Sequence, residues 1–233
     1  FSCFEAHSRM NALSEEEILQ HLNSALTETF RFLKETSHVI ITLGTSWVYR
    51  HLEQDKYVAN CHKIPQKNFR KALSSINEIE KSLRNTIGYI QQLNKNCEFI
   101  FTVSPVRHAK DGFVENTRSK SHLLNALHQI VEKENQLHYF PSYELMMDEL
   151  RDYRFYAEDL LHPNQVAIDY IWERFQETWL AEKCFPTMKK VQQIRQGLAH
   201  RPFNPNSVAY QKFQQKLQQQ IEQLQQQFLF MKF

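Results

Sequence analysis

The sequence predicts an α/β domain built around a parallel sheet, on three observations. Short runs of β-branched and aromatic residues alternate with longer segments whose apolar residues recur every three or four positions. The short runs are apolar at nearly every position, which is typical of parallel strands covered by helices on both faces. Only 4 glycines occur in 233 residues, which disfavours a barrel or sandwich with many tight turns.

The first predicted elements are a helix, a strand and a second helix. Residues 15–35 have apolar residues at helical spacing, and Ser14 ahead of Glu17 predicts a capping box at the start. Residues 38–46 ("HVIITLGTS") predict a buried strand, and residues 69–95 predict a long amphipathic helix. The apolar stripe of that helix is Ala72, Ile76, Ile79, Leu83, Ile87, Ile90 and Leu93.

The alternation continues through the middle of the chain. Residues 98–105 ("EFIFTVSP") predict a strand, residues 118–134 a helix, and residues 137–145 a third strand. Residues 164–182 predict a helix with Pro163 in its first turn, where a missing amide hydrogen is tolerated. Three strands are few for an open α/β sheet, which usually has about five. Either the domain is small or further strands precede this segment.

The character of the chain changes after Cys184. We expect an α/β domain over residues 1–184 and a helical extension over residues 185–233. Within the extension, residues 200–207 ("HRPFNPNS") predict a turn-rich joint, followed by a helix in a glutamine-rich segment. The helix either packs on its own domain or forms a seam between two copies of the chain. Its apolar stripe is Tyr210, Phe213, Leu217, Ile221, Leu224 and Phe228.

The composition is that of an ordinary globular protein. Hydrophobic residues make up 42% and charged residues 23%, and the formal net charge of +2 is too small to indicate nucleic acid or a membrane surface. No apolar run approaches the roughly 20 residues of a membrane span. The four cysteines lie far apart without a CxxC pair, which indicates reduced thiols rather than disulfides or a zinc site. We expect no metal, no cofactor and a cytoplasmic location.

Polar and titratable residues follow each predicted strand. The carboxyl ends of parallel strands meet at one edge of a sheet, where open α/β proteins bind ligands, so we expect these residues to gather there. Arg107 and His108 are candidates for substrate binding. An arginine there either binds a carboxylate or phosphate, or ties its loop to the acidic residues 148–159. The three segments are 44–49, 104–108 and 141–144.

The stretch "FYAEDLLHPNQ" (155–165) contains a candidate catalytic pair, with Asp159 three residues before His162. A carboxylate that accepts the Nδ1 proton fixes the tautomer of an imidazole and stabilises its protonated form, as a general base requires. The alternative is structural, since a side chain just before Pro163 can cap the helix that begins there. Because this spacing is common by chance, the spacing alone slightly favours the cap.

Five segments together carry a family resemblance: "TLGTSWVYR", "VANCHK", "FTVSPVRHAKDGFVENTRSK", "MMDELRDYRFYAEDLLHPN" and "LAHRPFNP". In this order they resemble the GSCFA-domain proteins, bacterial members of the broad SGNH/GDSL-like hydrolase fold. The resemblance implies a flavodoxin-like three-layer α/β/α sandwich and an esterase-type triad. Asp159 and His162 match its D-x-x-H-P block. Gly44 matches a glycine that lines the oxyanion hole, and Ser46 stands where the wider pattern has asparagine.

The serine of the implied triad is not identified in this chain. The family is named after a Gly-Ser-Cys-Phe-Ala motif, and the chain begins "FSCFEA". We do not assign Ser2 as the nucleophile, because a nucleophile turn follows a buried strand and only one helix separates Ser2 from Gly44. Phe4, His7 and Ser8 better match a different family segment. The resemblance therefore implies that the first βαβ portion, with the nucleophile, is missing, and that this chain alone is inactive.

Two functions follow from the resemblance. The first is an esterase or acyl hydrolase that acts on a small-molecule or acylated substrate. The second is a non-catalytic binding or scaffold module that retains the hydrolase fold, which Ser46 and the missing nucleophile favour. We expect no nucleic-acid partner, and the C-terminal helix is the candidate for homo-oligomerisation.

Overall fold

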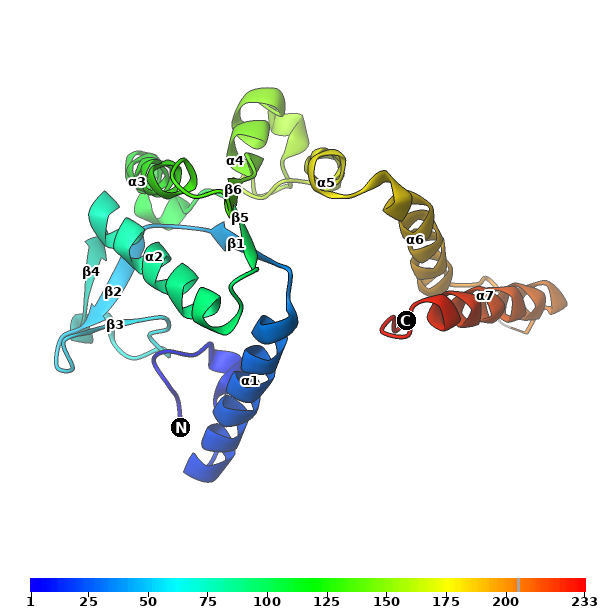
Figure 1. The fold of residues 1–233 in the computed structure, drawn as a ribbon, viewed down its shortest axis with the longest axis horizontal. Helices are drawn as coiled ribbons and strands as arrows, with labels where there is room; N and C mark the ends of the chain where they lie inside the picture. The colour runs from blue at the N-terminus through cyan, green and yellow to red at the C-terminus, as the bar shows by residue number, and fades with distance from the viewer. Residues whose placement is uncertain (205) are drawn as a thin grey trace. The chain divides into compact units, whose positions relative to one another are not determined.

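The chain, represented by a computed structural model, forms two compact units, Phe1–Trp172 and Glu173–Phe233 (Figure 1). The structure describes residues 1–204 and 206–233. Pro205, which belongs to the predicted joint at 200–207, lies outside the described residues.

A three-stranded parallel sheet forms the centre of the first unit. Its order is β1 (His38–Leu43), β5 (Glu98–Val103) and β6 (Leu137–Tyr139), so β5 lies in the middle. The strands are in register, with Ile41 opposite Phe101. Each was predicted from an apolar run, and the α/β class is confirmed. The arrangement is consistent with a three-layer α/β/α fold followed by C-terminal helices.

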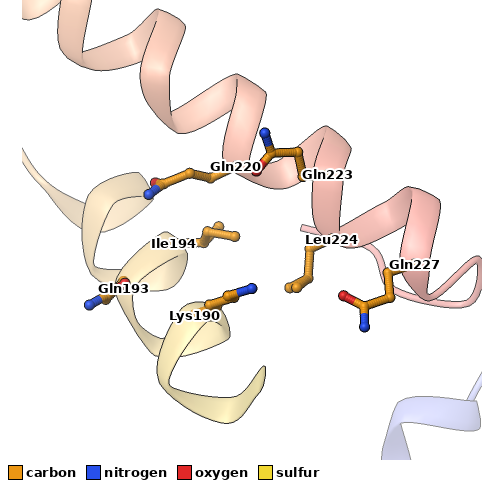
Figure 2. A pocket seen from close by; sticks show the side chains of 7 residues that line it. All are labelled: Lys190, Gln193, Ile194, Gln220, Gln223, Leu224 and Gln227. Carbon is orange, nitrogen blue, oxygen red and sulfur yellow. The ribbon is translucent and has the colours of Figure 1, made fainter. Parts of the chain in front are cut away.

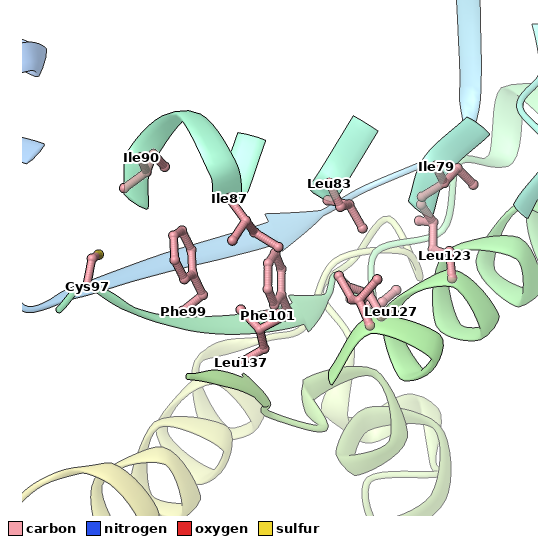
Figure 3. Close-up of a cluster of buried hydrophobic side chains, with 13 residues drawn as sticks. Ile79, Leu83, Ile87, Ile90, Cys97, Phe99, Phe101, Leu123, Leu127 and Leu137 are labelled. Carbon is pink, nitrogen blue, oxygen red and sulfur yellow. The ribbon is translucent and has the colours of Figure 1, made fainter. Parts of the chain in front are cut away.

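Helices α1 (Glu15–Glu35), α2 (Ile76–Leu93) and α3 (Phe113–Val131) belong to the same unit. Figure 3 shows side chains of α2 and α3 meeting those of β5. Together these side chains form the main hydrophobic core. The helix predicted at 118–134 begins five residues earlier, because Gly112 ends the preceding turn with a φ of +84°. The core residues labelled there are Ile79, Leu83, Ile87, Ile90, Cys97, Phe99, Phe101, Leu123, Leu127 and Leu137.

The capping box predicted at the start of α1 forms only in part. The Ser14 hydroxyl accepts a hydrogen bond from the Glu17 amide at 3.1 Å. The Glu17 carboxylate, however, accepts from the Leu13 amide at 3.2 Å instead of from Ser14. The complete capping box lies at the start of α2, where Ser75 and Glu78 satisfy one another's amides.

A second, antiparallel sheet was not predicted. Its order is β3 (Lys56–Val58), β2 (Trp47–His51), β4 (Phe69–Leu73). The prediction that the helical stripe begins at Ala72 is wrong, since Ala72 pairs with Val48 in this sheet. The helix starts only after the Ser75 cap. The predicted helix included the residues of β4 because α2 follows this strand almost directly.

The chain after β6 forms short helical turns before a longer helix. Helix α4 (Ser142–Glu144) leads into a π-helical turn, and α5 (Gln165–Trp179) follows after an irregular segment. A small separate core holds this region together. It contains the buried residues Met146, Leu150, Tyr156 and Ala167.

The second unit contains a helical hairpin formed by α6 (Phe185–Ala199) and α7 (Val208–Gln227). The centre of the α7 stripe is buried, because Leu217, Ile221 and Leu224 pack with Ile194 of α6. This is the packing expected of a helix bound to its own unit. Among the described residues, no helix is both long enough and apolar enough to cross a membrane.

Candidate functional site

A buried lysine joins the ends of two strands at the carboxyl edge of the parallel sheet. The Lys120 ammonium, from α3, donates to the carbonyl oxygens of Gly44 and Ser104, each at 2.6 Å. Burial lowers the pKa of Lys120 to about 8. The segments after β1 and β5 are therefore held together, as their positions after parallel strands predicted. Lys120 itself was missed, although it lies three and seven residues before the core residues Leu123 and Leu127.

The segment after β1 is fixed to α3 by a group of hydroxyls. The Ser46 amide donates to the Ser119 hydroxyl at 2.7 Å, and the Ser46 hydroxyl donates to the Ser119 carbonyl at 3.1 Å. Thr45 is also hydrogen-bonded to the Ser119 hydroxyl, at 3.0 Å. Ser46 is buried, and both its amide and its hydroxyl are engaged within the protein. Its role here is to position the loop.

His108 lies close to the backbone of Gly44. A Cβ placed on Gly44 would be 3.6 Å from His108 Nε2. The His108 amide donates to the buried side-chain oxygen of Asn116 at 2.9 Å, which fixes the loop after β5 to α3. Burial lowers the pKa of His108, and the positive charge of Lys120 lowers it further. Both effects favour the neutral form of the imidazole next to Gly44.

Asp159 and His162 form the pair that the sequence predicted. Asp159 Oδ2 accepts the Nδ1 proton of His162 at 2.5 Å. Asp159 Oδ1 accepts from the amides of Leu161 and His162, at 2.9 and 3.0 Å. These two amides, and then the imidazole, lower the pKa of Asp159 to about 2. The carboxylate is therefore ionised at neutral pH and directs the basic nitrogen Nε2 of His162 away from itself. The His162 side chain is 60% exposed.

The loop that holds this pair is short and closed by its own backbone. The Ala157 amide donates to the His162 carbonyl at 2.8 Å, and Tyr156 and Pro163 form an isolated β-bridge. Leu160, between Asp159 and His162, has a φ of +58°, in the left-handed region that few non-glycine residues adopt. This turn lets side chains three residues apart converge outside a helix.

The cap of α5 is a different residue, so the structure does not bear out the helix-cap interpretation of Asp159. Helix α5 begins at Gln165, and the Asn164 side-chain oxygen accepts from the Ala167 amide at 3.2 Å. The prediction that Pro163 lies in the first turn of the helix is wrong, because Asn164 takes the cap position after it. The Asp159 carboxylate binds amides of its own loop, not those of the helix.

Arg107 connects the loop after β5 with the loop of the Asp–His pair. Its guanidinium donates to the Tyr156 hydroxyl at 3.2 Å and to the Leu160 carbonyl at 3.5 Å, and lies 5.0 Å from the Tyr156 ring centre. Arg107 therefore does tie its loop to the segment 148–159 and its surroundings, but through neutral oxygens and a ring. Gly44, Ser46 and His108 therefore lie together on the loops after β1 and β5. Arg107, on the loop after β5, contacts the loop that carries Asp159 and His162.

A nucleophile for His162 is not found in the part of the chain that the structure describes. No hydroxyl or thiol among residues 1–204 and 206–233 is hydrogen-bonded to His162 Nε2. The segment around Ser2 is attached to the antiparallel sheet, because the Phe4 carbonyl accepts from the Ala59 amide at 2.8 Å and the Phe4 ring packs on Phe69. No group of three potential metal ligands occurs among the same described residues.

The fold and the site define an α/β protein whose parallel sheet carries, near its carboxyl edge, a histidine oriented by an ionised aspartate. Comparison with family models gives two matches: the GSCFA family over residues 1–175, and the C-terminal domain of GSCFA domain proteins over residues 191–233. The chain therefore belongs to the GSCFA family. None of the curated proteins compared with it matches.

Proposed function

We propose that this chain is part of a serine hydrolase of the SGNH/GDSL-like kind, with ester or acyl hydrolase activity. His162 is the general base and Asp159 its orienting carboxylate. The observation that carries the proposal is the 2.5 Å contact between Asp159 Oδ2 and His162 Nδ1. It supports a single tautomer with an exposed, basic Nε2, which is what proton abstraction from a serine requires.

The serine itself is proposed to lie outside these 233 residues. Within the residues that the structure describes, strand β1 pairs only with β5. Ile40 on β1 is 55% exposed, whereas its neighbour Ile100 on β5 is 3% exposed. An edge strand with an exposed apolar residue favours pairing with a further strand. If that strand runs parallel to β1, it ends beside Gly44, and a serine that follows it reaches this edge of the sheet.

The proposed chemistry is acyl transfer to this serine. The serine oxygen attacks the ester carbonyl as His162 Nε2 takes its proton, and the protonated imidazole then gives that proton to the leaving alcohol. Water hydrolyses the acyl-enzyme by the same route. Gly44 is proposed to line the oxyanion hole. Because the amide and hydroxyl of Ser46 are engaged by Ser119, we assign Ser46 no part in stabilising the oxyanion.

Arg107 and His108 are proposed to face the substrate. Arg107 uses two contacts to hold the neighbouring loop, and a guanidinium has five donors, so it retains donors for a polar or anionic acyl group. The imidazole of His108 adds a hydrogen-bonding group beside Gly44. The proposed substrate is a small-molecule ester or an acylated compound.

The test uses the full-length gene product, its His162→Ala variant and a control, His21→Ala, at an exposed position of α1. Each is measured for hydrolysis of p-nitrophenyl acetate and for labelling by a fluorophosphonate probe. We expect His162→Ala to lose roughly 10³-fold or more in turnover and most of its labelling, since loss of one triad member removes the covalent route. Equal turnover and labelling in wild type and His162→Ala would contradict the role of His162.

The second candidate function is a binding module without catalysis. It is favoured by one observation, that no hydroxyl contacts His162 Nε2 within residues 1–204 and 206–233. A full-length protein that is folded by circular dichroism, yet neither labelled by the probe nor active on any ester, would favour this function over hydrolysis.

A further inference from the structure

The small net charge of the chain conceals a strong asymmetry. The C-terminal hairpin, residues 185–233, contains seven lysines and arginines and one acidic residue, a formal charge of +6. Residues 1–184 therefore carry −4, which together with the hairpin gives the total of +2. The seven cations are Lys189, Lys190, Arg195, Arg201, Lys212, Lys216 and Lys232.

These cations have no carboxylate partners inside the protein. In the described part of the hairpin, 185–204 and 206–233, none of the seven forms an ion pair, whereas Arg50, Arg84 and Arg118 in the first unit all do. The single acidic residue, Glu222, accepts a hydrogen bond from the Gln218 side chain at 3.0 Å. An array of unpaired cations on one small unit attracts an external anionic surface.

Large apolar side chains lie exposed among these cations. We call this surface the basic apolar patch; it comprises Arg195, Leu198, Phe230, Lys232 and Phe233, together with Leu229, the exposed residue directly before Phe230. Leu229 is 90% exposed, Phe230 77% and Leu198 52%. A hollow of about 400 Å³ is lined by both kinds of residue, with Arg195 and Lys232 beside Leu198 and Phe230. The patch therefore combines apolar groups that are not covered by protein with positive charges at the same place.

A second hollow in the hairpin lacks this character. It has a volume of about 180 Å³, lies between α6 and α7, and is lined mainly by glutamines (Figure 2). Its apolar residues, Ile194 and Leu224, belong to the buried core of the hairpin. It therefore offers no exposed apolar group to an apolar and anionic partner, in contrast to the basic apolar patch.

We propose that the C-terminal hairpin binds the surface of an anionic lipid bilayer through the basic apolar patch. The cations contact lipid phosphates, and Leu198, Leu229 and Phe230 enter the boundary between headgroups and acyl chains. The aliphatic Leu198 and Leu229 favour lipid over nucleic acid, because single-stranded nucleic acid is bound by stacking on aromatic rings, whereas the rings of Phe230 and Phe233 fit either partner. A charge of +6 on each hairpin disfavours the pairing of two copies through this surface. In this proposal the hairpin lies at the membrane surface and does not cross the bilayer.

The experiment is co-sedimentation of the 233-residue chain with vesicles, either phosphatidylcholine alone or phosphatidylcholine and phosphatidylglycerol in equal parts. We expect binding to the mixed vesicles, which weakens as NaCl is added, and little binding to phosphatidylcholine. The double variant Arg195→Glu/Lys232→Glu should bind roughly tenfold or more weakly. Phe230→Ser should also bind more weakly, and both changes are at surface positions, so the fold is retained.

The matched control is Lys95→Glu/Lys133→Glu, which reverses two exposed charges of the first unit and should bind as the wild type does. Three outcomes would overturn the proposal. They are the absence of binding to mixed vesicles, equal binding by wild type and Arg195→Glu/Lys232→Glu, and loss of binding by the control to the same extent. Binding of the chain to an oligonucleotide but not to vesicles would assign the patch to nucleic acid instead.

Discussion

Asp159 uses one carboxylate oxygen to hold the imidazole of His162 and the other to hold the backbone amide of the same residue. Position and orientation of the histidine therefore depend on one side chain. Since the carboxylate pKa is lowered to about 2, this double contact is intact throughout the neutral range. The following predictions concern this pair and the residues that support it.

Asp159→Asn should abolish most of the activity of the full-length protein while leaving the fold intact. The amide that replaces Oδ2 can present a donor to Nδ1, which favours the wrong tautomer of His162, and a decrease in kcat of roughly 10³–10⁴-fold is expected. Asp169→Asn, a change at an exposed carboxylate of α5 that accepts a hydrogen bond from the Gln165 side chain, serves as the control. Ester hydrolysis is the measurement, and a kcat within a few-fold of wild type for Asp159→Asn would show that Asp159 does not orient the base.

Lys120→Met should destabilise the first unit at pH 7. The substitution keeps a side chain of similar length but leaves the carbonyls of Gly44 and Ser104 without their buried donor, an expected loss of about 2 kcal/mol in the free energy of unfolding. Lys133→Met, at an exposed position, should change it by about 0.5 kcal/mol or less. Urea unfolding followed by circular dichroism measures both. Equal midpoints for the two variants would mean that Lys120 contributes nothing to stability.

The same lysine should make stability depend on pH in the alkaline range. Its pKa is lowered from 10.5 to about 8 in the folded protein, so between these values the unfolded chain binds more protons than the folded one. The free energy of unfolding should therefore rise with pH from about 8 towards 10.5 through this group, and Lys120→Met should lack that contribution. Urea titrations of both proteins at several pH values give the difference, which should increase with pH; a constant difference would contradict the shift.

Arg107→Met should raise KM more than it lowers kcat for esters with an anionic acyl group. The guanidinium supports the loop of the Asp–His pair through Tyr156 and Leu160, and it is also the proposed contact for the acyl group. Loss of a charged contact of this kind should raise KM roughly tenfold. Arg151→Met is the control. A purely structural role would instead lower kcat equally for neutral and anionic esters, and comparison of the two substrates distinguishes these cases.

Helices and strands with a regular pattern of apolar residues were predictable from the sequence, and those without such a pattern were not. Helix α1 and strands β1 and β5 followed from apolar spacing over six residues or more. The antiparallel sheet was not predicted because its strands are only three to five residues long and mix charged with apolar residues. In addition, the turn before β3 uses Asp55 at a φ of +51°, where a glycine would have indicated a turn.

The contacts of the candidate site were predictable where residue types and spacing coincide. The contact of Asp159 with His162 followed from their types and their separation, and the place of Arg107 from its position after a strand. Lys120 was hidden among polar neighbours in "TRSKSH", and only its alignment with Leu123 and Leu127 indicated burial. The net charge of +2 does not indicate the basic hairpin, because the formal charge of +6 on residues 185–233 is largely offset by −4 on residues 1–184.

Every backbone and side-chain bond that defines the Asp–His geometry joins residues between Tyr156 and Pro163. Contacts of such short sequence separation form quickly, because little chain entropy is lost in closing the loop. The Asp159–His162 geometry is therefore set by local contacts, and the contacts of Arg107 with Tyr156 and Leu160 attach it to the loop after β5. If residues 156–163 were transferred to the corresponding loop of another α/β protein, the contact of Asp159 with His162 should be transferred with them. The direction in which His162 Nε2 points would then depend on how the recipient protein holds the loop.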